Sequence, residues 1–229
     1  MDTILQNWHI LKARIAQAAA RVSRDPGEIE VVAVTKTRLP AQIDAAINLG
    51  FFQLGENRIQ ETEDKKKQVK GLAQWHLIGH LQTNKAAKAA ALYDVIQSVD
   101  SLRLATALQQ RAAQSQRHLD VLLQVNTSRA SQQGGIIPEA VADLAGQIAL
   151  LSHLHIRGLM TIAAHSDDEA AVRACFTSLR ELGEGLEGVA AGVEMRYLSM
   201  GMSNDFEWAV EEGANMLRLG TAIFGPRPR

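Results

Sequence analysis

Short apolar segments rich in β-branched residues alternate with longer segments of helical periodicity along the whole chain. This alternation constrains the fold more than any other feature, because strands that alternate with helices form a parallel sheet with right-handed crossovers. Strands are predicted at residues 30–35, 51–54, 75–78, 94–99, 120–125, 155–162, 195–198 and 216–219. Helices are predicted at residues 3–22, 40–49, 58–70, 82–92, 101–116, 138–150, 167–186 and 205–212.

Eight such units in 229 residues predict a single (β/α)₈ TIM barrel, a fold of about 250 residues. The fold class is therefore α/β, with one barrel domain over residues 1–229. Only residues 220–229 follow the last strand, and the extra N-terminal helix at 3–22 is expected to cover the gap this leaves in the outer ring. The alternative is an open doubly wound sheet, which usually carries a glycine-rich turn after its first strand. The segment VAVTKTRLP at 32–40 has no glycine.

Charge and cysteine content exclude several protein classes. The 24 basic and 25 acidic residues nearly cancel, which argues against a nucleic-acid or membrane-surface binder. The one cysteine, Cys175, fits a reducing compartment. The N-terminus MDTILQNWHI does not resemble a signal peptide, and no apolar run reaches the ~18 residues of a membrane span. We therefore expect a cytoplasmic protein with no nucleic-acid or membrane partner.

Glycine and hydroxyl residues follow the last two predicted strands, where TIM barrels often bind phosphate. The seventh strand leads into residues 199–205, SMGMSND, and the eighth into Gly220-Thr221. Glycine admits close backbone approach, free N–H groups at a helix start favour an anion, and Ser203 adds a hydroxyl. Either loop alone is better explained as an N-cap or a turn. The two loops together predict a phosphate site.

Two basic residues occupy strand positions where charge is unexpected. Lys36 ends the first strand with the parity of Val32 and Val34, so it should face the barrel mouth near Gly220. A partly desolvated lysine there can form a Schiff base with an aldehyde, although a solvated lysine at a strand end is equally consistent with the position. Arg218 lies within the eighth strand and should point inward, either in a structural ion pair or as a donor to a ligand's ring nitrogen.

Several segments resemble, in order, those of the pyridoxal phosphate homeostasis proteins, the YggS/PROSC family. The resemblance extends from the first predicted strand nearly to the C-terminus. The segments are AVTK (33–36), GENRIQE (55–61), WHLIGHLQTNK (75–85), SVD (98–100), RGLMTI (157–162), LSMGMSND (198–205) and LRLGTAIFG (217–225).

The resemblance implies a barrel that binds pyridoxal 5′-phosphate (PLP) and is similar to the N-terminal domain of alanine racemase. It implies that Lys36 holds PLP as an internal aldimine, that Arg218 faces the pyridine nitrogen and that Asn57 lies near both. Phosphate contacts are implied for Ser203, Gly220, Thr221 and the backbone of the Ser199–Gly201 stretch. Two segments depart from the family pattern, neither at these contacts: Ser131–Gly135 (SQQGG) replaces Glu-x-x-Lys-x-Gly, and Gly213-Ala214 replaces Gly-Ser.

The resemblance also implies a role in intracellular PLP and amino-acid homeostasis without efficient catalysis. An arginine facing the ring nitrogen leaves it unprotonated, which weakens the electron sink. Alanine racemases take a second base from a tyrosine of a partner's second domain, and no such domain is expected in this protein. Tyr93 and Tyr197 lie on no predicted mouth loop. PLP is the expected ligand, PLP-dependent apoenzymes are candidate recipients, and a monomer is expected.

Two other function classes remain open at this stage. A racemase-like enzyme could use His76, His80 or His165 as its acid, and solvent deuterium exchange at the amino-acid α-carbon distinguishes this alternative. An RNA- or protein-binding module would rest on the charged run at 63–67, whose acidic and basic residues offset one another. No metal site is predicted, because His153 and His155 have no third ligand nearby.

Overall fold

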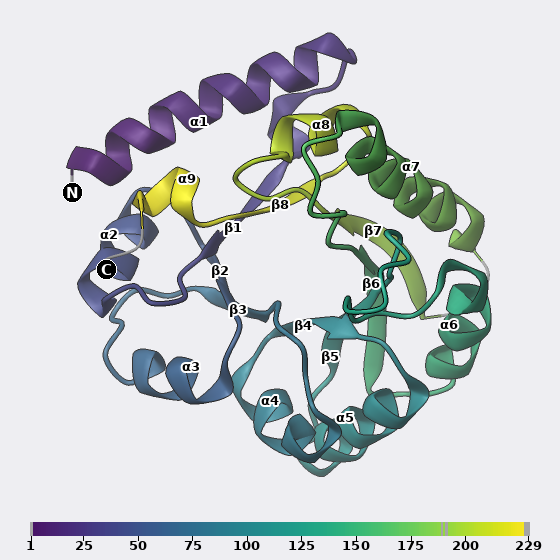
Figure 1. The fold of residues 1–229 in the computed structure, drawn as a ribbon. Helices are drawn as coiled ribbons and strands as arrows, with labels where there is room; N and C mark the ends of the chain where they lie inside the picture. Colours follow the sequence, from purple (N-terminus) through teal and green to yellow (C-terminus); the bar gives the residue numbers. More distant parts are fainter. Residues whose placement is uncertain (1, 189, 191, 227–229) are drawn as a thin grey trace.

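The computed structural model describes residues 2–188, 190 and 192–226. Eight parallel strands form a closed barrel (Figure 1), and β1 pairs with β8 to close it. The predicted fold class is confirmed. The strands are β1 (Glu30–Val34), β2 (Gln53–Glu56), β3 (Gln74–Leu77), β4 (Val95–Val99), β5 (Leu119–Gln124), β6 (Leu154–Met160), β7 (Val193–Ser199) and β8 (Met216–Leu219).

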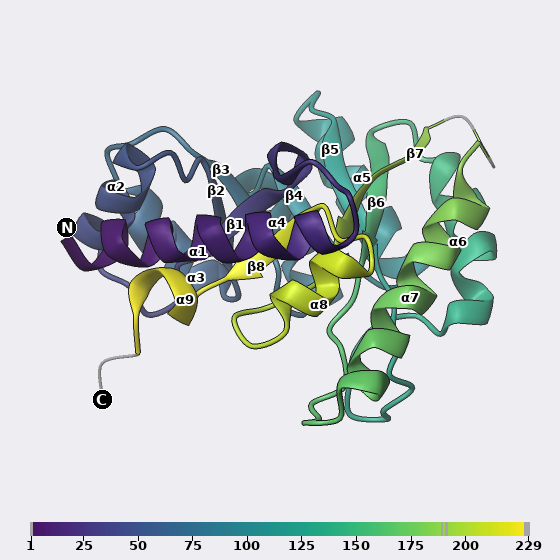
Figure 2. The ribbon, with the colours of Figure 1, turned by 90° about the horizontal axis from the view of Figure 1, so that it is seen from above.

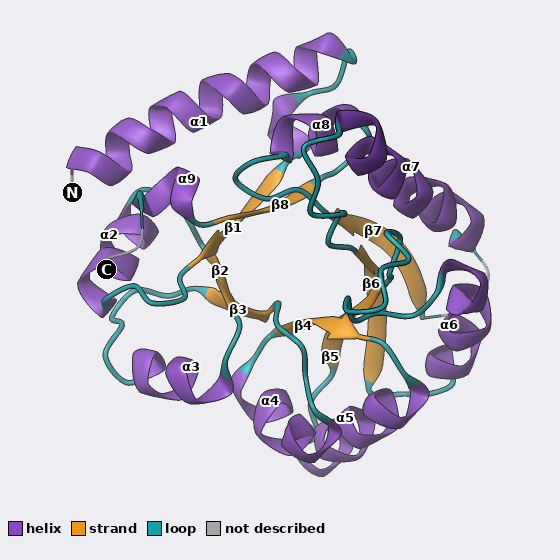
Figure 3. Ribbon diagram, viewed as in Figure 1, coloured by secondary structure: helices purple, strands orange, loops and turns teal. Residues whose placement is uncertain are grey.

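Helices surround the ring of strands (Figure 3). Short 3₁₀ turns at Thr83–Lys85 and Pro138–Ala140 begin two of the segments predicted as continuous helices. The helices are α1 (Asp2–Arg21), α2 (Pro40–Asn48), α3 (Ile59–Lys66), α4 (Ala86–Leu92), α5 (Leu102–Gln114), α6 (Val141–Ala149), α7 (Glu169–Leu186), α8 (Phe206–Glu211) and α9 (Thr221–Phe224). Among the described residues, no helix combines the length and apolarity needed to cross a membrane.

The N-terminal helix covers the outside of the barrel beside its last strand, as expected. Helix α1 packs against α8 and α9 (Figure 2). The chain that follows α1 is anchored by Arg24, whose guanidinium donates to the carbonyl oxygens of Val210 (2.8 Å) and Ala214 (2.9 Å). The cover is needed because only the four-residue α9 follows β8 before Gly225. Residues 227–229 of the predicted closing segment 220–229 lie outside the described residues.

The second strand lies two residues later than predicted, at Gln53–Glu56 instead of 51–54. Phe51 belongs to the turn after α2, where its N–H donates to the carbonyl oxygen of Ala46. Its ring packs against Trp8 of α1, with ring centroids 4.5 Å apart. The apolar pair at 51–52 suggested the strand start. The polar Glu56 is nevertheless part of the strand and fully buried.

Side-chain parity along the strands separates the barrel interior from the outer core. Val32, Leu122, Met160 and Met216 form a small apolar cluster inside the barrel. A much larger apolar cluster lies between strands and helices. Val32 is in register with Arg218 across β1 and β8. The inward-facing positions of these two strands therefore lie side by side, and the same alternation continues along each chain to the residues at the barrel mouth.

Candidate functional site

A pocket of about 630 Å³ lies at the carboxyl ends of the strands, a volume typical of small-molecule sites. Loops after β1, β2, β6, β7 and β8 contribute to its wall. Six of the eight residues predicted as cofactor contacts line it together: Lys36, Asn57, Ser203, Arg218, Gly220 and Thr221. The tertiary structure therefore brings together residues that are up to 185 positions apart in the chain (36 and 221).

The other two predicted contacts, Ser199 and Gly201, are buried behind this wall. The Ser199 hydroxyl accepts a hydrogen bond from Arg218 Nη1 at 2.8 Å and donates to Gln97 Oε1 at 2.6 Å. The Gly201 carbonyl oxygen accepts from the Arg218 backbone N–H at 3.0 Å. Both residues therefore position Arg218.

Lys36 stands in a tight turn directly after β1 and is half-buried. The next residue, Thr37, has a φ of 64°, in the left-handed region that β-branched residues rarely adopt. The Arg38 guanidinium donates to the carbonyl oxygens of Phe224 (3.4 Å) and Pro226 (3.2 Å). This bond set ties the Lys36 turn to the end of α9, and sequence reasoning did not identify Arg38.

Arg218 is buried and lines the pocket at the barrel mouth, which confirms the inward direction predicted from strand parity. Its Nη2 donates to the Thr161 carbonyl oxygen at 2.7 Å. Burial lowers the pKa of Arg218 to about 10, while the nearby Asp205 carboxylate acts to raise it. The guanidinium is therefore still protonated at neutral pH. Arginine carries more N–H donors than its bonds to Thr161 and Ser199 use, so it can also donate to a ligand.

The loops after β7 and β8 are joined at the predicted phosphate position. The Ser203 hydroxyl accepts from the Ala222 backbone N–H at 3.2 Å. Asp205 holds the same loop from within, since its carboxylate accepts from the Met202 N–H at 2.5 Å. Burial raises the pKa of Asp205 against that hydrogen bond and the Arg218 charge. The hydroxyls of Ser203 and Thr221 thus lie on one wall of the pocket.

Two amide side chains complete the pocket wall. Asn57 Oδ1 is buried and has no hydrogen-bond partner within the described chain, so it is placed to accept from a ligand. Gln133, in the loop that departs from the family pattern, lines the pocket and donates to the Ala163 carbonyl oxygen at 3.1 Å. An amine, hydroxyls, a guanidinium and an unpaired amide oxygen are groups that fit a phosphorylated pyridine aldehyde.

The three candidate histidines are dispersed. His165 lines the same pocket as Lys36. His80 lines a neighbouring cleft of about 590 Å³ between the loop after β2 and α4, to which Asn57 also contributes. His76 is buried at the opposite end of the barrel. Of the three, only His165 is positioned to approach a ligand beside Lys36.

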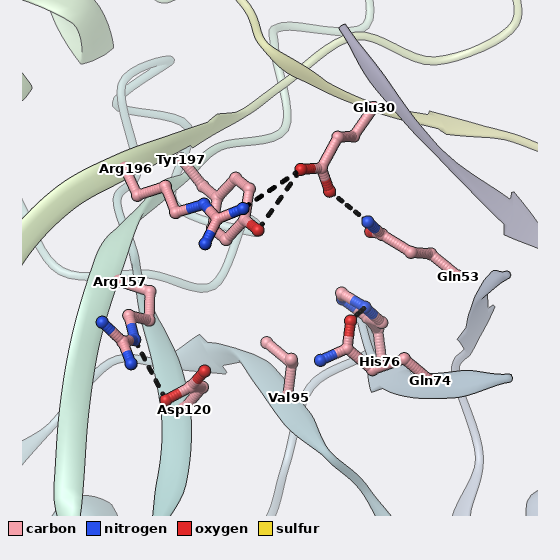
Figure 4. A pocket seen from close by; sticks show the side chains of 9 residues that line it. All are labelled: Glu30, Gln53, Gln74, His76, Val95, Asp120, Arg157, Arg196 and Tyr197. Atoms are coloured by element: carbon pink, nitrogen blue, oxygen red, sulfur yellow. Dashed lines mark hydrogen bonds and ion pairs between the residues drawn. The ribbon is translucent and has the colours of Figure 1, made fainter. Parts of the chain in front are cut away.

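A polar pocket of about 310 Å³ occupies that opposite, amino end (Figure 4). Its charged side chains pair with one another: Arg196 lies 3.7 Å from the Glu30 carboxylate, and Arg157 lies 3.1 Å from that of Asp120. His76 is neutral and bonded on both ring nitrogens, with Gln97 Nε2 at 2.8 Å and Gln74 Oε1 at 3.3 Å. Because the charged side chains that line this pocket pair with one another, they are explained as structural groups.

Acid is expected to destabilise the fold through His76. Burial lowers its pKa from 6.5 to about 3, so between these values the unfolded chain takes up a proton that the native chain does not. The free energy of unfolding should therefore fall by about 1.4 kcal/mol per pH unit as the pH drops through this window. Urea denaturation from about pH 7 to about pH 5 measures this slope. His76→Gln should reduce it and the exposed-site control His80→Gln should not; equal slopes in all three proteins would contradict the assignment.

Comparison with known proteins shows the family. Residues 2–228 match the family described as the N-terminal domain of alanine racemase. The pyridoxal phosphate homeostasis protein of Pseudomonas aeruginosa is 39% identical over 228 residues, 99% of this chain and 97% of the relative. That of Escherichia coli K12 is 36% identical over 236 residues, 99% of this chain and 98% of the relative. The chain belongs to the pyridoxal phosphate homeostasis protein family.

Solved structures extend this family relationship to the fold. PipY of Synechococcus elongatus, solved with PLP bound, is 36% identical with a TM-score of 0.80, over 92% of this chain and all (100%) of PipY. An alanine racemase of Clostridium difficile has a TM-score of 0.76 at 15% identity, over 100% of this chain but 57% of the racemase. The pyridoxal phosphate homeostasis protein family and alanine racemases therefore share this barrel.

Proposed function

We propose that this chain binds PLP in the pocket at the carboxyl ends of the strands and holds it covalently through Lys36. The observation that carries the proposal is the meeting of Lys36, Arg218 and the Ser203–Thr221 hydroxyls in one pocket. PLP supplies an aldehyde that bonds reversibly to a primary amine and a pyridine ring that can withdraw electrons. The names of the relatives and the PLP in PipY support the same ligand.

Different residues of the pocket bind different parts of the ligand. The hydroxyls of Ser203 and Thr221, with the backbone at Gly220, bind the phosphate. Arg218 donates to the ring nitrogen, and Asn57 accepts from the ring substituents on the Lys36 side. Ser199 and Gly201, whose backbone is predicted to contact the phosphate, also hold Arg218 in place through the Ser199 hydroxyl and the Gly201 carbonyl oxygen.

We further propose that the bound cofactor is held in reserve and not used for efficient turnover. A guanidinium that stays protonated at neutral pH donates a hydrogen bond to the ring nitrogen without transferring its proton. The ring is then a weak electron sink for amino-acid chemistry. Tyr197, which a racemase-like enzyme could use, lines the amino-end pocket, on the far side of the barrel from Lys36.

The proposed cellular role is PLP homeostasis. Reversible bonding of an amine to an aldehyde suits a protein that keeps a reactive cofactor at low free concentration and releases it. PLP-dependent apoenzymes, which need that cofactor, are the proposed recipients. The naming of the relatives as homeostasis proteins supports this role.

One preparation tests both parts of the proposal. Purified protein titrated with PLP should develop a visible absorbance band that saturates at one PLP per chain, and borohydride should fix the cofactor to Lys36, located by peptide mass spectrometry. The loaded protein, incubated with L-alanine in heavy water, should exchange the α-hydrogen no faster than free PLP does. Absence of a band would contradict the binding site, and rapid exchange would favour an enzyme that uses His165.

A further inference from the structure

A buried ion cluster lies directly beneath the Lys36 turn. Its centre is Lys65 of α3, whose ammonium donates to the backbone carbonyl oxygen of Thr35 and to the carboxylates of Glu56 and Glu61, each at 2.6 Å. Glu56 ends β2 and also accepts from the Thr35 hydroxyl at 2.6 Å. The cluster therefore joins the end of β2, both ends of α3 and the residue that precedes Lys36.

The same cluster holds the residue that follows Lys36. Glu61 Oε1 accepts from the Thr37 backbone N–H at 2.5 Å, and Thr37 is the residue with a φ of 64°. A left-handed conformation at a β-branched residue persists only where surrounding contacts impose it. The bond from Glu61 is such a contact, so the backbone on both sides of Lys36 is fixed by one set of charges.

Stability alone does not explain these charges. The side chains of Lys65 and Glu56 are 7% and 0% exposed, and Glu56 Oε2 has no hydrogen-bond partner among the described residues. Burial raises the pKa of Glu56 even though Lys65 and Thr35 act to lower it. A well-packed apolar pair often stabilises a fold as much as a buried ion pair does. Apolar side chains could not form the hydrogen bonds to the Thr35 carbonyl oxygen and the Thr37 N–H on the two sides of Lys36.

We infer that Lys65, Glu56 and Glu61 are positioning residues that aim the Lys36 amine at the aldehyde of PLP. This inference rests on the proposed function. The cluster does not touch the phosphate-binding residues, so it should govern covalent attachment and leave non-covalent binding intact.

The decisive variant is Glu61→Ala, matched by Glu63→Ala. Both glutamates lie on α3 with side chains of similar exposure, 27% and 30%, but Glu63 pairs outward with Lys88. Alanine suits a helix at both positions. Each protein is titrated with PLP and, separately, with pyridoxine 5′-phosphate, which has the same ring and phosphate but no aldehyde.

Glu61→Ala should weaken PLP binding by about tenfold to a hundredfold, the cost of misplacing a reactive group. Its affinity for pyridoxine 5′-phosphate should be unchanged. Glu61→Gln should recover part of the lost PLP affinity, because its amide oxygen still accepts from the Thr37 N–H. Glu63→Ala should bind both ligands as wild type does. Equal weakening of both ligands, or no weakening of PLP, would overturn the inference. Wild-type protein without a Lys36 adduct would instead refute the proposed function.

A second variant examines the buried pair. Glu56→Gln/Lys65→Met removes the two most buried charges together, so that neither of them is left without its partner, and Glu61, 27% exposed, keeps contact with water. Thermal melting should show that it folds. Attachment of PLP should be slowed by at least about tenfold while pyridoxine 5′-phosphate still binds. Wild-type attachment rates in this folded double variant would also overturn the inference.

Discussion

Lys36→Ala should show no visible band with PLP and no borohydride-stable adduct. Lys36 is the lysine that lines the pocket beside Arg218 and the Ser203–Thr221 hydroxyls. Lys65, the lysine beneath it, cannot take over, because its side chain is 7% exposed and its ammonium donates three hydrogen bonds within the protein. Without the covalent bond, PLP affinity should fall at least about tenfold, equivalent to about 1.4 kcal/mol.

Non-covalent binding should survive this substitution. The hydroxyls of Ser203 and Thr221 and the guanidinium of Arg218 do not depend on the lysine amine. Pyridoxine 5′-phosphate should therefore bind Lys36→Ala as it binds wild type. Lys67→Ala is the control, since Lys67 is 75% exposed and pairs with Asp64 at 3.8 Å. An adduct that persists in Lys36→Ala, on any other lysine, would contradict the assignment.

Gly158→Ala should strongly destabilise the fold. A Cβ at Gly158 would lie 1.9 Å from the carbonyl oxygen of Tyr197. The backbone φ of Gly158 is 149°, a value that residues with a side chain rarely adopt. Gly158 pairs with Tyr197 where the β6–β7 register shifts. The strands would have to separate, so the free energy of unfolding should fall by more than about 4 kcal/mol. Urea denaturation followed by circular dichroism measures the loss.

A second glycine provides the matched control. A Cβ added at Gly146, on α6, meets no atom within 4 Å. Gly146→Ala should therefore stabilise the protein by about 0.5–1 kcal/mol, because alanine restricts the unfolded chain more than glycine does. A Gly158→Ala protein with near wild-type stability would show that β6 and β7 do not approach as closely as described.

The barrel and the direction of its key side chains could be predicted from local patterns. Apolar runs separated by helical segments indicated eight strands, and the two-residue period of a strand indicated that Lys36 and Arg218 face inward. The gap after β8 indicated the position of α1. The β2 boundary was wrong because an apolar residue, Phe51, packs against α1 outside the strand, and a charged one, Glu56, is buried within it.

The contacts of polar side chains were not predictable in the same way. The sequence does not indicate that Gly158 lies against the Tyr197 backbone, because that contact joins two strands far apart in the chain. Arg38 and Lys65 look like ordinary charged residues in the sequence, yet one binds carbonyl oxygens after α9 and the other lies under the Lys36 turn. Ser199 carries a hydroxyl in a phosphate-type loop, but its partner is Arg218.

By itself, the sequence determined the alternation of elements, the inward face of each strand and the chemical groups available at the barrel mouth. These depend on periodicity and residue type, which are local properties of the chain. The tertiary structure alone decided which groups meet a ligand and which support them from behind. That division depends on hydrogen bonds between residues far apart in the chain, and such bonds exist only after barrel closure has brought β1, β7 and β8 together and removed water from between them.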